Sequence, residues 1–217
     1  SAVAERTCEL IAQDHGLTID YGYTDFKMAD AAEKKPGVQF TETMKGHWSV
    51  NEKEDFEKGQ DAGKDSGSVF EFTLTVISTD VDAMLNSKDH HAQLAGVVKA
   101  PALSSKALTV SNGVFNLFVD DTAAVPTKLM KYSMVLNSEE GKQYFFYGYK
   151  VVRDDKGFDL WKDTCTLFIT VHDGPTADSP VLGKGILVIE TKDFIVQMTT
   201  MKVLNASSKL QELKILT

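Results

Sequence analysis

The residues best suited to recognise a ligand are aromatic and gather in one short segment. Within residues 144–149 all but one position carries a ring, and alternation along a strand would send Phe145, Tyr147 and Tyr149 to one side. A cavity lined by these rings and by the two tryptophans of the chain would suit a flat apolar ligand. We therefore predict an aromatic-lined ligand site formed by Trp48, Phe145, Tyr147, Tyr149 and Trp161, with His47 beside it.

The same rings have two other uses. Core packing is the commoner role of large aromatic side chains, and one face of a strand in a barrel wall must point away from the interior. Rings on that outer face would imply a surface covered by a terminal helix or by another chain. An interaction module with a solid core, which forms a homo- or hetero-oligomer through outward aromatics, therefore stays open as an alternative.

The histidines suggest no strong metal or catalytic site. His90 and His91 are adjacent, and neighbours on a helix point about 100° apart, so they are poorly placed to chelate one ion. His172 and Asp173 could form half of an acid/base pair, but only common Ser and Thr residues could serve as its nucleophile. We assign no metal ligand and no catalytic residue, and expect a polar helix end and a hydrogen-bonded turn at these two places.

Acidic loops raise calcium as a weak alternative cofactor. Carboxylates recur at residues 120–121, 154–155 and 159–163, and loops that met at one barrel end could bind Ca²⁺. None of them matches the EF-hand pattern, so solvated turns are the expected structure. The chain also lacks flavin and nicotinamide motifs, which leaves the cofactor unknown.

Charge and hydropathy limit the classes of molecule that the chain is expected to bind. The chain has 217 residues and a net charge of −8, and its basic residues are scattered, which argues against a nucleic-acid partner. Apolar residues make up 42% of the sequence, as in a soluble folded protein with a substantial core. No apolar run approaches the roughly 18 residues that a membrane span needs. A small apolar molecule or a second copy of the chain remains as the expected partner.

The N-terminus, the cysteines and one sequon bear on localisation. The chain begins at Ser1 without Met and carries the triplet Asn205-Ala206-Ser207, which together favour a processed, secreted protein. Cys8 and Cys165 would then be available for a disulfide that ties the N-terminal segment to a late strand. A cytoplasmic protein with two buried thiols is the alternative.

Short alternating segments predict an all-β fold with few short helices. Residues 70–77 form the cleanest pattern, and residues 81–85 after Asp80 read as a short helix. Three hairpins follow, the first turning at Asn112-Gly113, because this dipeptide tolerates the positive φ of a tight turn. The predicted hairpins pair residues 108–110 with 114–118, residues 132–136 with 144–147, and residues 149–152 with 164–171.

Eight or nine such strands in sequential hairpins predict an antiparallel meander. A meander of this size closes into a β-barrel, our preferred fold class, or folds into a sandwich, the alternative. We expect one domain over residues 1–217. It comprises an N-terminal helical or irregular segment (1–37), the barrel (38–206) and a weakly helical tail (207–217).

Several stretches resemble an accessory module of large bacterial glucose-methanol-choline oxidoreductases, the cholesterol-oxidase-like proteins that also carry an α/β-hydrolase region. The resemblance covers roughly Phe40 to Ala206 and implies an accessory β-domain standing alone, with a hint of sterol-like or lipid-like ligands. The chain lacks the Gly-x-Gly-x-x-Gly and Gly-x-Ser-x-Gly motifs, so flavin binding and hydrolase chemistry are not implied. The resembling stretches are residues 40–46, 72–75, 113–118, 130–132, 148–150, 159–164 and 183–187.

The sequence therefore leaves three functions open. The first is a non-enzymatic protein that binds a lipid, a sterol or a pigment-like molecule in an aromatic-lined barrel. The second is the oligomerising interaction module with a solid core. The third is a small isomerase or cyclase acting through a pocket histidine, which requires His47 or His172 to face the cavity. Alternation leaves that orientation open.

Overall fold

The computed structural model describes residues 34–120, 127–153 and 165–216, together with Leu10, Ala12, Asp14 and Gly16. The chain divides into two units, Ser1–Lys34 and Lys35–Thr217, and the strands of the described residues all lie in the second. Cys8, Trp161 and most of the predicted N-terminal helix fall outside the described residues, so the proposed disulfide stays a prediction. The elements are β1 (Gly37–Ser49), α2 (Phe56–Ser66), β2 (Val69–Ser78), α3 (Val81–Asn86), β3 (His91–Lys99), β4 (Leu108–Asp120), β5 (Thr127–Asn137), β6 (Gln143–Arg153), β7 (Thr166–His172), β8 (Val181–Val188), α5 (Thr191–Thr200), β9 (Lys202–Leu204) and α6 (Lys209–Leu216).

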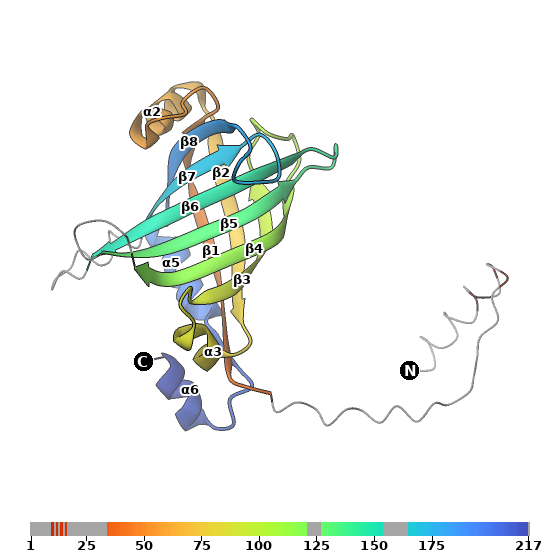
Figure 1. Ribbon diagram of the computed structural model, residues 1–217, viewed down its shortest axis with the longest axis vertical. Helices are drawn as coiled ribbons and strands as arrows, with labels where there is room; N and C mark the ends of the chain where they lie inside the picture. The colour runs from red at the N-terminus through yellow and green to blue at the C-terminus, as the bar shows by residue number, and fades with distance from the viewer. Residues whose placement is uncertain are drawn as a thin grey trace. The chain divides into compact units, whose positions relative to one another are not determined.

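Strands β1 to β8 form a closed antiparallel barrel (Figure 1). Each strand pairs with the next along the chain, and β8 returns to pair with β1, which also pairs with β2. The predicted meander barrel is confirmed. Because the barrel is closed, each of these eight strands pairs with a neighbour on both sides over at least part of its length. An unpaired edge that could associate with another chain is thereby reduced.

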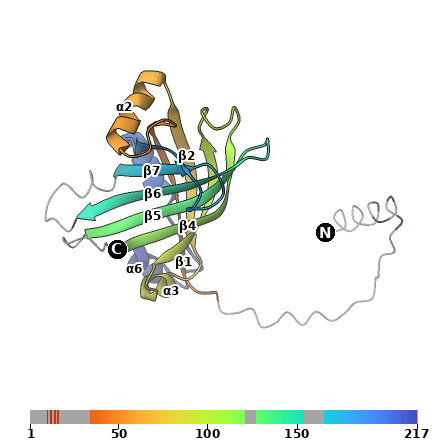
Figure 2. The ribbon, with the colours of Figure 1, turned by 45° about the horizontal axis from the view of Figure 1, so that its top comes forward.

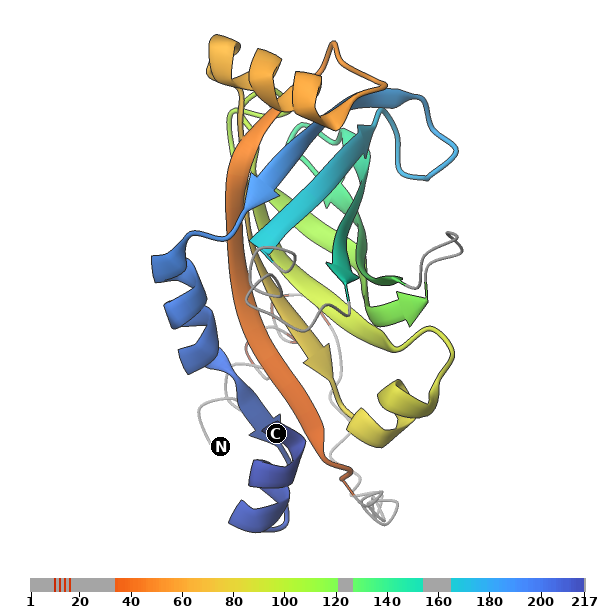
Figure 3. The same cartoon turned by 90° about the vertical axis from the view of Figure 1, so that its left-hand side faces the viewer.

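The barrel wall has one place where a helix replaces a strand. Strand β1 pairs with β8 only over Lys45–Ser49 and with β9 only over Gly37–Gln39. Between these stretches α5 lies along β1 (Figure 3). The hydroxyl of Thr200 accepts a hydrogen bond from the Thr41 N–H at 2.8 Å, and its proton lies within reach of the carbonyl oxygens of Gln197 at 2.7 Å and Thr41 at 3.2 Å. The helix thus satisfies backbone groups of β1 that a strand would otherwise pair.

Helix α2 covers the end of the barrel at which Trp48 of β1 and Lys184 of β8 lie (Figure 2). The helix carries two buried glycines, Gly59 and Gly63, on the face that docks on the barrel. A Cβ on Gly59 would lie 2.3 Å from the Lys184 carbonyl oxygen, and one on Gly63 would lie 2.5 Å from that of Trp48. Only glycine lets the helix approach the strand backbones this closely.

The first predicted hairpin is wrong. Residues 108–120 form one continuous strand, β4, and Asn112 adopts a φ of 50° within a bulge rather than a turn. The Asn112-Gly113 dipeptide does supply positive φ tolerance, but a bulge uses the same conformational freedom. The hairpin of β5 and β6 is confirmed, as is the helix after Asp80, whose side chain accepts a hydrogen bond from the Ala83 N–H.

The barrel interior near α2 is filled by aromatic rings in mutual contact. Trp48 lies edge-on to Phe70, and Phe70 stacks on Phe146, with ring centroids 5.8 Å and 5.5 Å apart. The series continues through Phe72, Tyr132 and Phe115 to Phe40. The contacts among Trp48, Phe70, Phe72 and Phe146 make the α2 half of the barrel a packed core.

Candidate functional site

A buried ion pair crosses the inside of the barrel. Glu42 of β1 and Lys150 of β6 are 2% and 1% exposed, and the Lys150 Nζ lies 2.7 Å from the Glu42 Oε2. Both side chains occupy inward positions in their strands, since Met44 and Phe146 share their respective faces and are fully buried. Taking two charges out of water costs several kcal/mol per ion, roughly, so this pair is an expensive feature of the core.

Two polar side chains complete the cluster. The Tyr132 hydroxyl donates to the Glu42 Oε1 at 3.0 Å, and the Gln197 Nε2 donates to the Glu42 Oε2 at 3.4 Å. Burial, and then the negative charge of Glu42, raise the pKa of the Tyr132 phenol well above its ordinary value, so this hydroxyl stays a donor. Gln197 comes from α5, the helix that fills the wall. We call Glu42, Lys150, Tyr132 and Gln197 the polar cluster.

The polar cluster keeps hydrogen-bonding capacity that the described protein atoms do not use. A lysine ammonium has three N–H donors, and within the described residues Lys150 bonds only to Glu42, with the Tyr132 ring 5.3 Å from its Nζ. The Gln197 Oε1 is buried and has no hydrogen-bond partner among the same residues. Buried donors and acceptors are normally satisfied, so the unused capacity of Lys150 and Gln197 is an exception that needs a physical reason.

Four apolar side chains beyond the polar cluster are only partly buried, although Val76, Ala92 and Phe115 on that side are enclosed. Phe40, Leu117, Met130 and Phe194 pack against the core but are only partly buried, whereas Phe72, Phe146 and Leu167 are 0% exposed. Phe40 and Met130 lie two residues along their strands from Glu42 and Tyr132, on the same inward face. Solvent therefore reaches inward-facing apolar groups next to the polar cluster.

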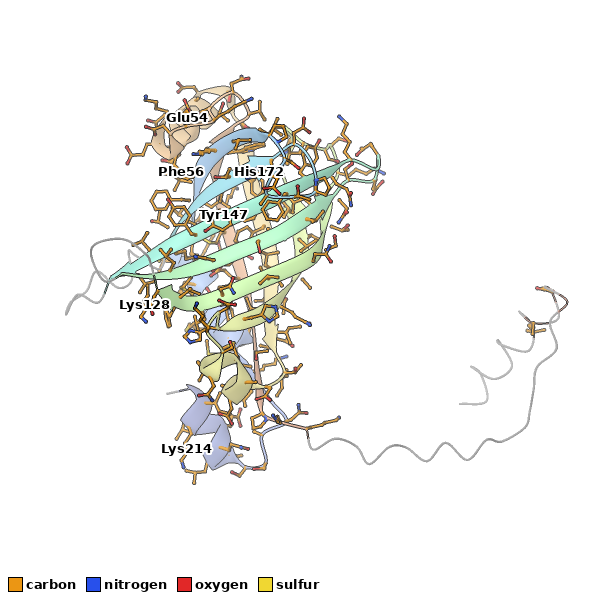
Figure 4. All side chains as sticks on the ribbon, in the orientation of Figure 1. Glu54, Phe56, Lys128, Tyr147, His172 and Lys214 are labelled. Atoms are coloured by element: carbon orange, nitrogen blue, oxygen red, sulfur yellow. The ribbon has the colours of Figure 1, made fainter. Side chains whose placement is uncertain are left out.

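The predicted aromatic site is not assembled in the barrel. Phe145, Tyr147 and Tyr149 point outward from β6, because Tyr144, Phe146 and Lys150 take the inward positions. These three rings therefore do not line the barrel interior. They lie on the outer surface, where Figure 4 labels Tyr147, and the ring centroids of Tyr147 and Tyr149 lie 6.2 Å apart.

The outer rings instead form a band across the wall. Phe56, at the start of α2, contacts Tyr149 and Phe168 with ring centroids 5.9 Å and 5.4 Å apart. Phe145 packs edge-on against His172 at 5.7 Å. One end of the band is thus covered by a helix of the chain itself, though α2 is not a terminal helix. Oligomerisation through this surface stays a prediction.

The other predicted site residues divide between the two faces. Trp48 is inside and fully buried, with its Nε1 lacking a hydrogen-bond partner among the described residues, while its neighbour His47 faces outward and is half-buried. His172 also lies outside, bonded through Nδ1 to the Ser179 carbonyl at 2.8 Å. A pocket histidine is therefore not provided by either candidate.

His90, His91 and the acidic loops were the remaining candidates for a metal site. His91 begins β3 rather than ending a helix, and His90 bonds through Nδ1 to the Leu117 carbonyl. Most of the acidic loop residues considered for calcium lie outside the described ranges. Within those ranges no three His, Cys, Asp or Glu side chains gather closely enough to hold a metal. Nor does any described helix have the length and apolarity to cross a membrane.

Comparison with known proteins adds no relative. Neither the family models, nor the curated proteins, nor the solved structures contain a match to this chain. The resemblance to the oxidoreductase accessory module accordingly stays a proposal.

Two members of the polar cluster, Glu42 and Lys150, leave a signal in the sequence. Glu42 alternates with Phe40 and Met44, and Lys150 shares its face with Tyr144 and Phe146. A charged residue on an otherwise apolar face is the available signal. Nothing in the sequence shows that two such residues, separated by 108 positions, meet at 2.7 Å.

The raised pKa of Tyr132 predicts a pH dependence. Because the Tyr132 pKa is higher in the folded protein than in the unfolded chain, the stability that the protonated phenol contributes is complete below about pH 10. This contribution is lost as the pH rises above that value, because the unfolded chain then releases the proton more readily. We expect the free energy of unfolding to fall by about 1.4 kcal/mol per pH unit more steeply in the wild type than in Tyr132→Phe. Urea titrations between neutral and alkaline pH measure this difference. Tyr144→Phe, which retains Tyr132, is the matched control, and equal slopes in wild type and Tyr132→Phe would contradict the prediction.

Proposed function

We propose that the chain binds a small, largely apolar molecule inside the barrel, with the polar group of the ligand at the polar cluster. The observation that carries this proposal is the buried, unused capacity of two side chains. Lys150 has N–H donors to spare, and the Gln197 Oε1 lacks a donor among the described residues. A ligand oxygen that accepts from Lys150 and a ligand hydroxyl that donates to Gln197 would satisfy both.

Charge argues for a neutral ligand. The Glu42 carboxylate and the Lys150 ammonium cancel, and Tyr132 stays protonated, so the polar cluster carries no net charge. A carboxylate or an amine would add an uncompensated charge in a dry environment, at a cost of several kcal/mol, roughly. Ketones, aldehydes and alcohols meet the requirement.

The position of the apolar body follows from the packing. On the α2 side of the polar cluster the aromatic rings are fully buried and in contact with one another. On the other side, Phe40, Leu117, Met130 and Phe194 are partly buried and keep contact with solvent. The body of the ligand would lie against these four side chains, and their apolar surface supports a lipid-like or sterol-like molecule, as the sequence resemblance also suggests.

The histidine-dependent isomerase is the weaker candidate, because neither His47 nor His172 faces the interior. The aromatic band on the outer wall gives the interaction module its support, but the unused buried groups favour ligand binding. The two functions occupy different surfaces and are compatible.

The proposal is tested by the affinity of a long-chain alcohol and of the matching methyl ketone. Displacement of phenylnaphthylamine, a neutral apolar fluorescent probe, reports both. Gln197→Leu should weaken alcohol binding about tenfold, since about 1.4 kcal/mol is lost with one buried hydrogen bond, and should leave ketone binding unchanged.

Lys106→Met removes an exposed ion pair with Glu139 and is the control. It should change neither affinity. Native mass spectrometry of the protein from its natural source should show a mass excess that disappears on denaturation. Failure of the probe, the alcohol and the ketone to bind the wild type would overturn the proposed function.

A further inference from the structure

We infer that Lys150 can hold an apolar aldehyde covalently, as a protonated imine within the barrel. This inference rests on the proposed function, since the aldehyde must first enter the same site. The ligand class is apolar carbonyl compounds, and the reacting atom is the Lys150 Nζ.

The first support is the isolation of this amine from water. Lys150 is the only lysine in the described residues that is buried, at 1% exposure, and the rest of its strand face is apolar. An enclosed lysine is suited to hold a carbonyl compound as an imine, because bulk water, which would hydrolyse the imine, is excluded from the site.

The second support is the carboxylate at hydrogen-bond distance. The Glu42 Oε2 is 2.7 Å from the Lys150 Nζ, so a proton can pass along this hydrogen bond and leave a free amine. Tyr132 and Gln197 donate to Glu42 and hold the carboxylate in place. Glu42 can therefore take a proton from the amine and return it later.

The reaction balances with these two groups alone. The Lys150 ammonium gives one proton to Glu42, and the lone pair of the amine forms a C–N bond to the carbonyl carbon. A proton moves from nitrogen to the former carbonyl oxygen, which gives a neutral carbinolamine. Glu42 returns its proton to that hydroxyl, the C–O bond breaks, and water leaves. The product is a protonated imine beside the Glu42 carboxylate.

Electrostatics favour this product. The protonated imine carries one positive charge, as the ammonium did, so the buried pair with Glu42 persists through the reaction. The ring of Tyr132, whose centroid lies 5.3 Å from the Lys150 Nζ, remains beside the cation. No charge is left uncompensated in the barrel.

The test uses the wild-type protein, decanal and cyanoborohydride, which reduces an imine to a stable amine. Peptide mapping by mass spectrometry compares labelling of Lys150 with that of the exposed Lys106. A lysine that is merely buried should be the slowest to react. If the inference holds, Lys150 is labelled at least about ten times faster than Lys106, because a bound aldehyde reacts as if intramolecular.

Two outcomes separate this inference from the proposed function. If phenylnaphthylamine and the long-chain ketone bind while Lys150 stays unlabelled, the imine is excluded and the binding function stands. If neither molecule binds and Lys150 stays unlabelled, both proposals fail. Lys150→Arg keeps the positive charge but has no amine that can form the imine. It should lose the fast-labelled site while keeping the circular dichroism spectrum of the folded barrel, and persistence of a fast site in this variant would overturn the assignment to Lys150.

Discussion

Lys150→Met is expected to lower the free energy of unfolding by about 3–5 kcal/mol, the typical cost of removing one partner from a buried ion pair. The loss arises because the Glu42 carboxylate would stay buried at 2% exposure without its counter-ion. Hydrogen bonds from Tyr132 and Gln197 would remain, but neither carries a charge. Urea unfolding followed by circular dichroism measures the effect.

The double variant Glu42→Gln/Lys150→Met distinguishes a charge effect from a packing effect. It removes both charges, and the amide oxygen can still accept from Tyr132, so much of the stability lost in the single variant should return. We expect a coupling energy of at least about 2 kcal/mol between the two positions, in the range that interacting neighbours show. Additive losses would mean that the two side chains do not depend on each other. Lys106→Met, which breaks an exposed ion pair, is the control and should have little effect.

Gly63→Ala is expected to destabilise the protein by about 1–3 kcal/mol, although alanine is the better helix former. The new Cβ would lie 2.5 Å from the Trp48 carbonyl oxygen and 2.6 Å from its amide nitrogen. Both atoms belong to the barrel wall and cannot move aside as a flexible side chain can. Helix α2 would have to shift away from β1 and β8.

A displaced α2 should also be visible in fluorescence. Trp48 is 0% exposed and lies beneath this helix, so its emission should shift to longer wavelength in Gly63→Ala. Lys58→Ala changes an exposed position of the same helix and should leave both the emission and the urea midpoint close to those of the wild type. A fully stable Gly63→Ala with unchanged emission would show that the close approach of α2 is not required.

The local pattern of the chain was enough to predict the architecture. Alternating segments with short polar connections are typical of antiparallel hairpins, and their number predicts closure. The helix after Asp80 and the hairpin of β5 and β6 were also predictable, because capping and turn chemistry act between residues close in sequence. The strand β3 was missed, since its small residues and Gly96 weaken the alternation.

Only the tertiary structure decided how several local signals are used. The Asn112-Gly113 dipeptide tolerates positive φ in a turn and in a bulge alike, and the pairing of β4 with β5 selects the bulge. The glycines of α2 suggest a flexible loop until the strand backbones beneath them are known. In each case the conformational preference is local, but the partner that makes use of it is distant in the chain.

The orientation of β6 is the clearest feature that the local sequence does not determine. Alternation determines which residues share a face, but both faces of β6 carry rings, and nothing local decides which of them points inward. Lys150 lies on the inward face, where a charge is costly without a partner. That partner, Glu42, is 108 positions away and is brought within 2.7 Å by the closure of the barrel. The sequence by itself therefore determined the barrel, and the tertiary structure decided its interior, because charge compensation in a core depends on contacts that span the whole fold.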